Sequence, residues 1–248
     1  MPLLIAIAAG LAFVLWAMGR PIIPQFGKVE LPPNPLGQFR LGDRVIIIGL
    51  PLSGKTYLAG KLTKDVPRIL FFDPYHDYKE AAKATEIKAD DLIKNPKMLH
   101  TSRFRLSIIP NEDFLADQLE DCVSIARAAG NLVFVMDEVG DYKKEATGTL
   151  EKLARNGRHN GLVPIYVSQV AMDIPRTVRR LASQVYSFRQ NDIDDLDALA
   201  ERYGEPFAEK VSKLPPHEFA KWTPSQDFGR SNQSPGKRLA SSDVTRPK

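Results

Sequence analysis

The stretch Val45-Ile-Ile-Ile-Gly49-Leu-Pro-Leu-Ser-Gly54-Lys55-Thr56 decides the fold of this chain. Its first four residues are β-branched and apolar, which predicts a buried strand. Residues 49–56 match the pattern G-x-x-x-x-G-K-T, in which backbone N–H groups surround the β-phosphate, the lysine reaches the β and γ phosphates and the threonine hydroxyl binds Mg²⁺. Because this loop lies between a strand and a helix, we expect ATP to bind at Gly49, Leu50, Pro51, Leu52, Ser53, Gly54, Lys55, Thr56 and Tyr57.

Short apolar runs alternate with helical patterns along the rest of the chain. Predicted strands cover residues 44–48, 68–72, 104–109, 132–136, 163–167 and 185–188. Predicted helices cover residues 55–64, 112–129, 145–156, 176–183 and 193–203, with Gly130 ending the longest. Most of these strands are apolar on both faces, as buried parallel strands are. We therefore expect an α/β domain over residues 43–222, with three layers around a mainly parallel central sheet.

Two adjacent carboxylates, Asp137 and Glu138, follow the apolar strand at residues 132–136. Beside a phosphate-binding loop, we expect Asp137 to hold Mg²⁺ together with Thr56. We expect Glu138 to be the general base that polarises the attacking water, which favours ATP hydrolysis over a GTPase arrangement. The alternative is a pair of acids at a solvated strand end.

A polar amide, Gln169, follows the strand at residues 163–167. The carboxyl ends of parallel strands lie at one edge of a sheet, so Thr56, Asp137 and Gln169 are expected to converge there. In that position Gln169 would sense the γ-phosphate. The alternative is a glutamine that caps a helix or a turn.

The composition is that of a globular protein. The chain has 248 residues, 43% hydrophobic and 26% charged, which excludes a wholly disordered, collagenous or multi-span membrane protein. Its formal charge of +4 comes from the flanks, since residues 45–222 carry 25 basic and 26 acidic side chains. The basic pI of about 9.1 is therefore weak evidence that the core binds nucleic acid. A single cysteine, Cys122, is expected to be buried in a cytosolic domain.

The first nineteen residues differ in kind from the rest. Residues 2–19 contain no charged or strongly polar side chain, and as a helix they would span about 27 Å. We interpret residues 1–19 as one transmembrane anchor, with a cleaved signal peptide as the alternative. The cations that follow would keep the remaining chain in the cytoplasm by the positive-inside rule. These cations are Arg20, Lys28, Arg40 and Arg44.

The segments on either side of the predicted domain have distinct compositions. Residues 20–42 are rich in proline and glycine, which predicts a semi-rigid tether. Residues 223–248 are rich in Ser, Pro, Gly, Asn and basic side chains without apolar periodicity, which predicts a disordered basic tail.

These motifs resemble those of the FtsK-HerA superfamily of RecA-like P-loop ATPases. The resemblance covers about residues 43–205 and rests on residues 49–56, Phe72-Asp73-Pro74, Val135-Met-Asp-Glu138 and Ser168-Gln169. Within it, residues 154–161, 167–169 and 173–176 are most similar to the genome-packaging ATPases of tailless icosahedral phages with an internal membrane, the tectivirus-like group. The resemblance implies a RecA-like (ASCE) fold and small proteins that assemble at a portal vertex, where double-stranded DNA enters the capsid.

Two arginine clusters fit this resemblance. Arg155 and Arg158 are spaced i, i+3 beside the apolar face of their helix, and ring ATPases of this superfamily commonly supply an arginine finger to a neighbouring subunit. The alternative is a solvated basic helix face. The second cluster is Arg176, Arg179 and Arg180, for which a subunit contact, a DNA contact and ordinary surface charge all stay open.

Motifs and resemblance together predict an ATPase that uses ATP and Mg²⁺ to translocate double-stranded DNA into a viral procapsid. The implied partners are double-stranded DNA, further copies of the chain in a homo-oligomeric ring, expected as a hexamer, and portal-vertex or capsid proteins. Residues 2–19 would anchor the ring in the host inner membrane or the internal membrane of the virion. The alternatives are an ATPase for filamentous-phage-type assembly or secretion, a conjugative DNA-transfer ATPase, and a nucleotide-binding scaffold without hydrolysis.

Overall fold

The computed structural model describes residues 29–224. The predicted transmembrane anchor, the first part of the tether and nearly all of the predicted tail lie outside this range. Within residues 29–224, no helix is long and apolar enough to cross a membrane.

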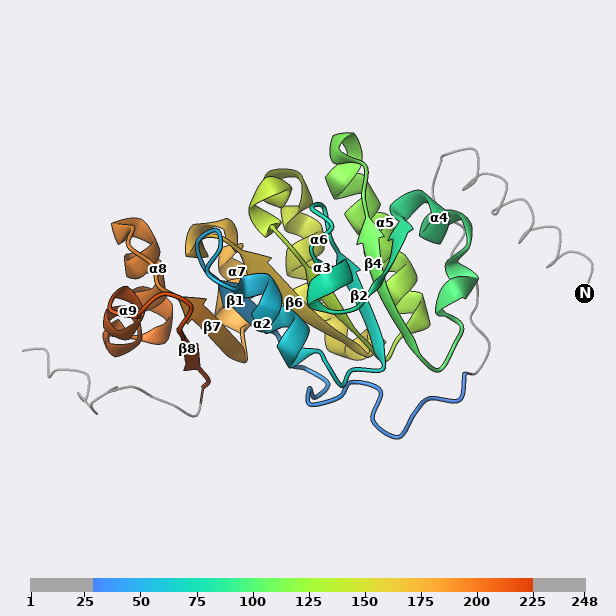
Figure 1. Ribbon diagram of the computed structural model, residues 1–248, viewed down its shortest axis with the longest axis horizontal. Helices are drawn as coiled ribbons and strands as arrows, with labels where there is room; N and C mark the ends of the chain where they lie inside the picture. Colours follow the sequence, from blue (N-terminus) through green and yellow to red (C-terminus); the bar gives the residue numbers. More distant parts are fainter. Residues whose placement is uncertain (1–28, 225–248) are drawn as a thin grey trace, which may run out of the picture.

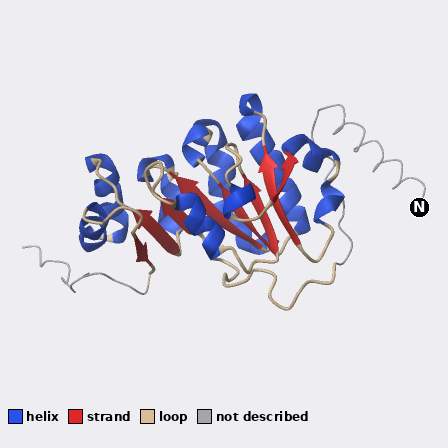
Figure 2. Cartoon of the chain, in the orientation of Figure 1, coloured by secondary structure: helices blue, strands red, loops and turns tan. Residues whose placement is uncertain are grey.

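One eight-stranded sheet forms the centre of the domain (Figures 1 and 2). Its strands are β1 (Val45–Ile48), β2 (Arg68–Phe72), β3 (Thr85–Lys88), β4 (Phe104–Ile109), β5 (Leu132–Met136), β6 (Leu162–Ser168), β7 (Gln184–Phe188) and β8 (Phe219–Trp222). They lie in the order β3-β4-β2-β5-β6-β1-β7-β8. Every neighbouring pair is parallel except β7 and β8. The six predicted strands and the mainly parallel sheet are therefore confirmed.

Helices cover both faces of the sheet (Figure 1). One face carries α2 (Lys55–Leu62) and α3 (Tyr78–Ala81), and the other carries α4 (Ala89–Lys94), α5 (Leu115–Ala129), α6 (Lys143–Asn156) and α7 (Arg176–Leu181). Near the β8 edge, α8 (Ile193–Tyr203) and α9 (Glu205–Ser212) pack against the same core as α5 and α6. The helix Leu115–Ala129 ends at Gly130, whose φ is +58°. The predicted α/β layering is confirmed.

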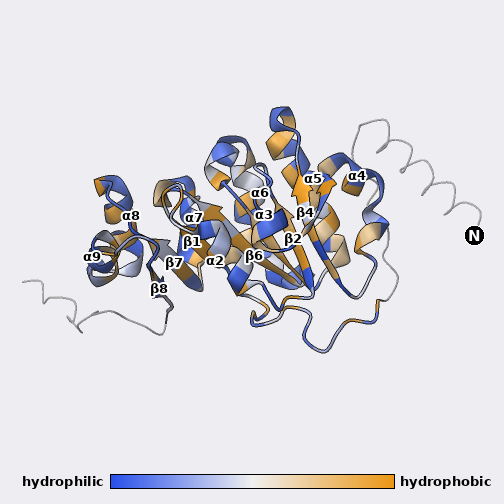
Figure 3. Cartoon of the chain, viewed as in Figure 1, coloured by the Kyte–Doolittle hydropathy of each residue, from blue (hydrophilic) through white to orange (hydrophobic). Residues whose placement is uncertain are grey.

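Alternating side chains of the strands separate two hydrophobic cores. In β1, Val45 and Ile47 face the core beneath α2, whereas Ile46 and Ile48 face the larger core beneath α5 and α6. All four are fully buried, which explains why the strand sequence has no polar alternation. The central strands are coloured mainly hydrophobic in Figure 3, and the helices carry hydrophilic residues on their outer sides.

The segment before β1 lies against the domain. Leu36 and Phe39 are buried in the core beneath α2, together with Leu58 and Val66. The backbone N–H of Arg40 donates to Asp43 Oδ2 at 2.9 Å and closes the turn that leads into the strand. This part of the proline-rich stretch therefore contributes apolar surface to the folded domain.

Candidate functional site

The phosphate-binding loop joins the end of β1 to the start of α2, as predicted. Gly49 has no room for a side chain, because a Cβ atom there would lie 2.4 Å from Ser53 Oγ and 2.9 Å from Phe188 Cβ. Gly54 has a φ of +107°, which L-residues with side chains rarely adopt. Both glycines of the motif are thus required by the loop backbone, and Phe188 of β7 supports the loop from the side.

The loop presents an anion-binding helix end. Gly54 stands at the N-cap of α2 and has no side chain to bond the first-turn N–H groups, which leaves them free for a phosphate. Lys55 begins the helix and is buried. Its Nζ lies 3.4 Å from the carbonyl oxygen of Leu50 and 3.6 Å from Glu138 Oε1. The Lys55 ammonium therefore lies between the loop and the catalytic carboxylate predicted from the sequence.

Asp137 and Glu138 lie at the carboxyl end of β5 in different environments. Asp137 is almost fully buried, and its Oδ1 accepts the N–H of Glu138 at 3.1 Å. Burial, followed by the charge of Glu138, raises the pKa of the Asp137 carboxyl well above its usual range, while Lys55 opposes the shift. Glu138 is partly exposed and has a φ of +44°, a left-handed conformation that is strained for this residue.

The donor set at this edge fits Mg²⁺. The Asp137 carboxyl accepts one N–H, that of Glu138, and its burial, together with the nearby charge of Glu138, raises its pKa, so its charged form needs a cation beside it. A hard divalent cation that prefers oxygen ligands would supply that positive charge. Thr56, half-buried in the first turn of α2, offers a hydroxyl from the loop. We therefore retain Thr56 and Asp137 as the residues that would hold Mg²⁺.

The sheet brings Gln169 to the same edge. Ile48 is paired with Ser168, so Gly49 and Gln169 follow side by side, and β6 lies between the loop strand β1 and the carboxylate strand β5. The N–H of Gly49 donates to the carbonyl oxygen of Ser168 at 3.2 Å, which ties the start of the loop to β6. Gln169 thus follows β6 beside the start of the loop, and its sensing of the γ-phosphate stays a prediction.

A second glutamine, Gln190, was missed by the sequence analysis. It follows β7 and is almost fully buried, and its Nε2 donates to the carbonyl oxygen of Gln169 at 3.2 Å. Its Oε1 has no hydrogen-bond partner among residues 29–224. Because β1 lies between β6 and β7, this bond passes over the end of the loop strand and fixes the backbone of Gln169. No sequence motif marks Gln190, and its role depends on a carbonyl 21 residues away.

Gln190→Leu is expected to reduce kcat for ATP about three- to tenfold and to leave KM nearly unchanged. Leucine removes the donor to the Gln169 carbonyl oxygen and frees the backbone of the residue predicted to sense the γ-phosphate, a loss comparable to one net hydrogen bond. Steady-state kinetics measures the effect. Gln184→Leu, at the opposite end of the same strand β7, is the control and should keep the wild-type kcat. Equal kinetics for the two variants would contradict a positioning role of Gln190.

Asp73 and Tyr75, at the end of β2, are structural in this conformation. The buried Asp73 carboxylate accepts the N–H groups of Asp77 and Tyr78, both at 3.0 Å, and the hydroxyl of Ser107 at 2.6 Å. Tyr75 donates its hydroxyl to Asp141 at 2.8 Å, and this bond raises its pKa to about 12. Asp73 therefore holds the turn after β2, and Tyr75 joins that turn to the loop after β5.

Asp73→Ala is expected to destabilise the domain by about 2–4 kcal/mol, because the buried carboxylate accepts three hydrogen bonds whose donors would lose their partner. Thermal unfolding followed by circular dichroism should show a Tm lower by roughly 5–10 °C. Asp77→Ala, an exposed aspartate four residues on, is the control. A Tm within one degree of wild type for Asp73→Ala would contradict the structural role.

Arg155 and Arg158 lie away from the loop of their own chain. The helix α6 starts near the carboxyl end of β5 and ends near the amino end of β6, so Arg155 at its end is carried to the opposite edge of the sheet. Arg155 is exposed and bonds Glu151 at 3.1 Å and Thr177 Oγ1 at 3.3 Å. Arg158 is also exposed. Their action on the nucleotide of a neighbouring subunit stays a prediction.

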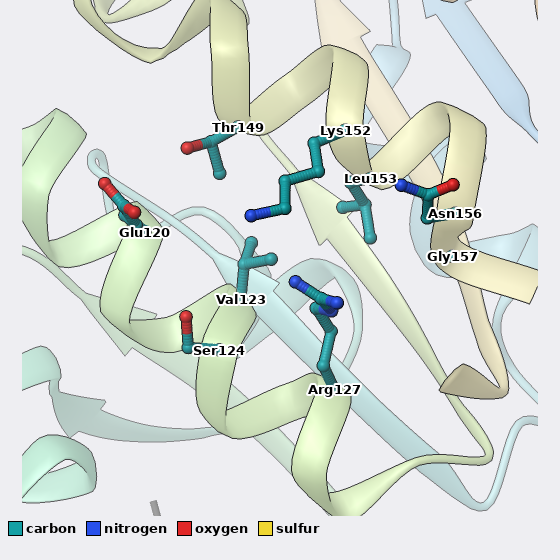
Figure 4. A pocket seen from close by; sticks show the side chains of 9 residues that line it. All are labelled: Glu120, Val123, Ser124, Arg127, Thr149, Lys152, Leu153, Asn156 and Gly157. Atoms are coloured by element: carbon teal, nitrogen blue, oxygen red, sulfur yellow. The ribbon is translucent and has the colours of Figure 1, made fainter. Parts of the chain in front are cut away.

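A small hollow between α5 and α6 is shown in Figure 4. Its volume of about 30 Å³ has room for one or two water molecules and none for a nucleotide. Arg127 and Lys152 extend toward the same space from the two helices. This hollow is therefore separate from the nucleotide site.

Comparison with known proteins supports the fold of the site. No protein-family model matches the chain, and no curated protein matches it significantly. Among solved structures, the genome packaging NTPase B204 of Sulfolobus turreted icosahedral virus 2 in complex with AMP is similar, with a TM-score of 0.59 and 20% identity over 75% of this chain and 94% of that chain. B204 has also been solved in complex with ATP-gammaS.

Two ATPases from other systems share the fold. The cytoplasmic domain of the type VII secretion ATPase EccC of Thermomonospora curvata has a TM-score of 0.50 and 17% identity over 74% of this chain and 25% of that chain. The pCW3 conjugation coupling protein TcpA has a TM-score of 0.51 and 12% identity over 75% of this chain and 59% of that chain. The resemblance to FtsK-HerA ATPases is therefore confirmed at the level of the fold.

Proposed function

We propose that this protein is a Mg²⁺-dependent ATPase that couples hydrolysis to the translocation of double-stranded DNA, and that it packages viral DNA into a procapsid. The observation that carries the proposal is the convergence of the loop at residues 49–56, the carboxylates Asp137 and Glu138, and Gln169 at one edge of a parallel sheet. Ligand sites of open α/β sheets lie at this edge. The similarity to B204 supports the proposal through the shared fold.

The residues of the site have distinct chemical roles. Lys55 and the first-turn N–H groups of α2 would bind the β and γ phosphates, with Thr56 and Asp137 holding Mg²⁺, which neutralises phosphate charge when bound. Glu138 would take a proton from the water that attacks the γ-phosphorus in line. Glu138 Oε1 lies 3.6 Å from Lys55 Nζ, so the general base and the phosphate-binding lysine would act side by side. An arginine from an adjacent subunit, Arg155 or Arg158, would complete the site.

The proposal includes an assembly and a location. A homo-oligomeric ring, expected as a hexamer, would enclose double-stranded DNA and dock on portal-vertex or capsid proteins. The distance of Arg155 from its own nucleotide site supports shared sites between copies. Residues 2–19 would anchor the ring in the host inner membrane or the internal membrane of the virion, with the domain on the cytoplasmic side.

The similarity to B204 favours packaging over the alternative functions. Its TM-score of 0.59 and identity of 20% exceed the 0.51 and 12% of TcpA and the 0.50 and 17% of EccC. VirB4 of Thermoanaerobacter pseudethanolicus, of which the chain covers 87%, has a TM-score of 0.55 and 12% identity. Protein secretion and conjugative transfer are the second candidates.

The first test is hydrolysis of ATP by the full-length chain in detergent micelles. We expect ATP turnover that requires Mg²⁺, stops when EDTA is added and is stimulated by double-stranded DNA. The turnover rate per chain should rise with the protein concentration, because higher concentration favours the ring. The release of inorganic phosphate measures it. Turnover that is indifferent to DNA at every protein concentration would shift the function to secretion, and absence of turnover would contradict the ATPase assignment.

A further inference from the structure

A basic pocket separate from the nucleotide site lies between α7 and α8. It has a volume of about 340 Å³ and is lined by Arg176, Arg179, Arg180, Ala198, Glu201 and Arg202. Four arginines and one glutamate give the lining a net charge of +3. We call it the α7–α8 pocket.

Arg179 builds the wall of this pocket. Its side chain turns inward and is buried, and its Nη1 donates to the carbonyl oxygens of Ala171 at 2.8 Å and Ile174 at 3.0 Å. This arginine therefore holds the turn before α7. Arg179 is therefore not available for the subunit or DNA contact that the sequence left open for Arg176, Arg179 and Arg180. Arg202, which the sequence did not group with them, lines the pocket instead.

Arg202 is held in position by the end of α7. Its Nε donates to the carbonyl oxygen of Arg179 at 3.4 Å and its Nη2 to that of Arg180 at 2.5 Å. The hydroxyl of Tyr203 donates to the same Arg179 carbonyl at 3.1 Å. A guanidinium fixed in this way loses little further freedom when it binds an anion.

Arg176 and Arg180 complete the positive lining. Arg180 is exposed, and its guanidinium has no hydrogen bond or ion pair with any residue of the described part of the chain. Arg176 pairs with Glu201 at 2.8 Å, but both side chains are more than 60% exposed, and such surface pairs are weak. A more highly charged anion can therefore displace Glu201 from Arg176.

We propose that the α7–α8 pocket binds a phosphoryl group. Arg176, Arg180 and Arg202 line a cavity larger than a phosphate, and guanidinium forks match phosphate oxygens in pairs. The phosphoryl group has two sources within the proposed function: the backbone of double-stranded DNA, or the nucleotide bound by a second copy of the chain. The binding of phosphate itself does not depend on the proposed function.

The first arm of the test uses inorganic pyrophosphate and the full-length Lys55→Ala chain in detergent micelles, in which the loop site is disabled. Isothermal titration should show binding that weakens about tenfold or more when Arg176→Gln and Arg180→Gln are added. Adding Glu201→Gln instead should tighten binding, because it removes the competing carboxylate. Arg103→Gln is the control, since Arg103 is an exposed arginine just before β4, at the amino edge of the sheet.

The second arm identifies the source. If DNA supplies the phosphate, the Arg176→Gln, Arg180→Gln protein with Lys55 intact should bind a labelled 30-base-pair duplex with a salt slope reduced by about two, and hydrolyse ATP without DNA at the wild-type rate. If a second copy supplies it, duplex binding should stay unchanged and DNA-free hydrolysis should fall.

The proposal is overturned if the Lys55→Ala chain does not bind pyrophosphate, or if the pocket variants and Arg103→Gln bind it equally. A wild-type chain without ATP turnover would contradict the proposed function and leave the pyrophosphate result intact, so the two failures are distinguishable.

Discussion

Lys55→Ala is expected to abolish measurable ATP hydrolysis, with kcat/KM lower by about 10²–10³-fold or more. The Lys55 ammonium is buried at the start of α2, and residues 49–57 contain no other cation that could replace it. Its loss also leaves Glu138 without its ion-pair partner at 3.6 Å. Phosphate release measures turnover, and a fluorescent ATP analogue measures the accompanying loss of affinity.

Lys61→Ala is the matched control for this variant. Lys61 lies in the last turn of the same helix and is exposed, so its replacement changes the net charge equally without touching the loop. It should keep wild-type turnover and a similar Tm. Turnover by Lys55→Ala within threefold of the Lys61→Ala rate would exclude residues 49–56 as the hydrolytic site.

Those parts of the fold that depend on local sequence were predictable. The strand at residues 45–48 is continuous in apolar residues because both of its faces are buried, and the two glycines that follow mark the loop backbone. The carboxylates after β5 and the amide after β6 could be placed at the same edge because parallel strands share their carboxyl edge.

The edge strands were missed for a physical reason. β3 has no buried residue and β8 alternates between exposed and buried ones, and each has only four residues. Such short segments form strands because a neighbouring strand offers free N–H and C=O groups for hydrogen bonds. Their strand conformation therefore depends on the neighbouring strand more than on their own sequence. The helix α9, eight residues long and directly after Gly204, depends in the same way on the core that it covers.

The polar residues Gln190, Arg179 and Arg202 show a second limit. Each is fixed by carbonyl oxygens of other segments: those of Gln169, of Ala171 and Ile174, and of Arg179 and Arg180. Spacing along a helix groups Arg179 with Arg176 and Arg180 as surface cations, but only the packed turn before α7 reveals that Arg179 points inward. Sequence patterns predict which face is apolar, and they do not predict which buried carbonyls require a donor.

Glu138→Gln is expected to lower kcat by about 10²–10⁴-fold while ATP still binds. Glutamine keeps the size of the side chain but cannot take the proton of the attacking water, so chemistry stops after the nucleotide is bound. The ion pair with Lys55 is also lost, which frees the lysine for the phosphates and should leave the affinity for ATP equal to or higher than that of the wild type.

Single-turnover hydrolysis and equilibrium binding separate these two effects. Asp141→Asn is the control, because Asp141 lies in the same turn, is exposed, and bonds Tyr75 rather than Lys55. If Glu138→Gln bound ATP weakly, and its turnover fell only by the factor by which its affinity for ATP fell, Glu138 would be a binding residue. Another residue would then have to be the general base. Retained ATP binding without hydrolysis would instead assign proton transfer to Glu138. The variant still contains Asp137, the other carboxylate at this strand end, so such a result would also show that Asp137 cannot replace Glu138 as the base.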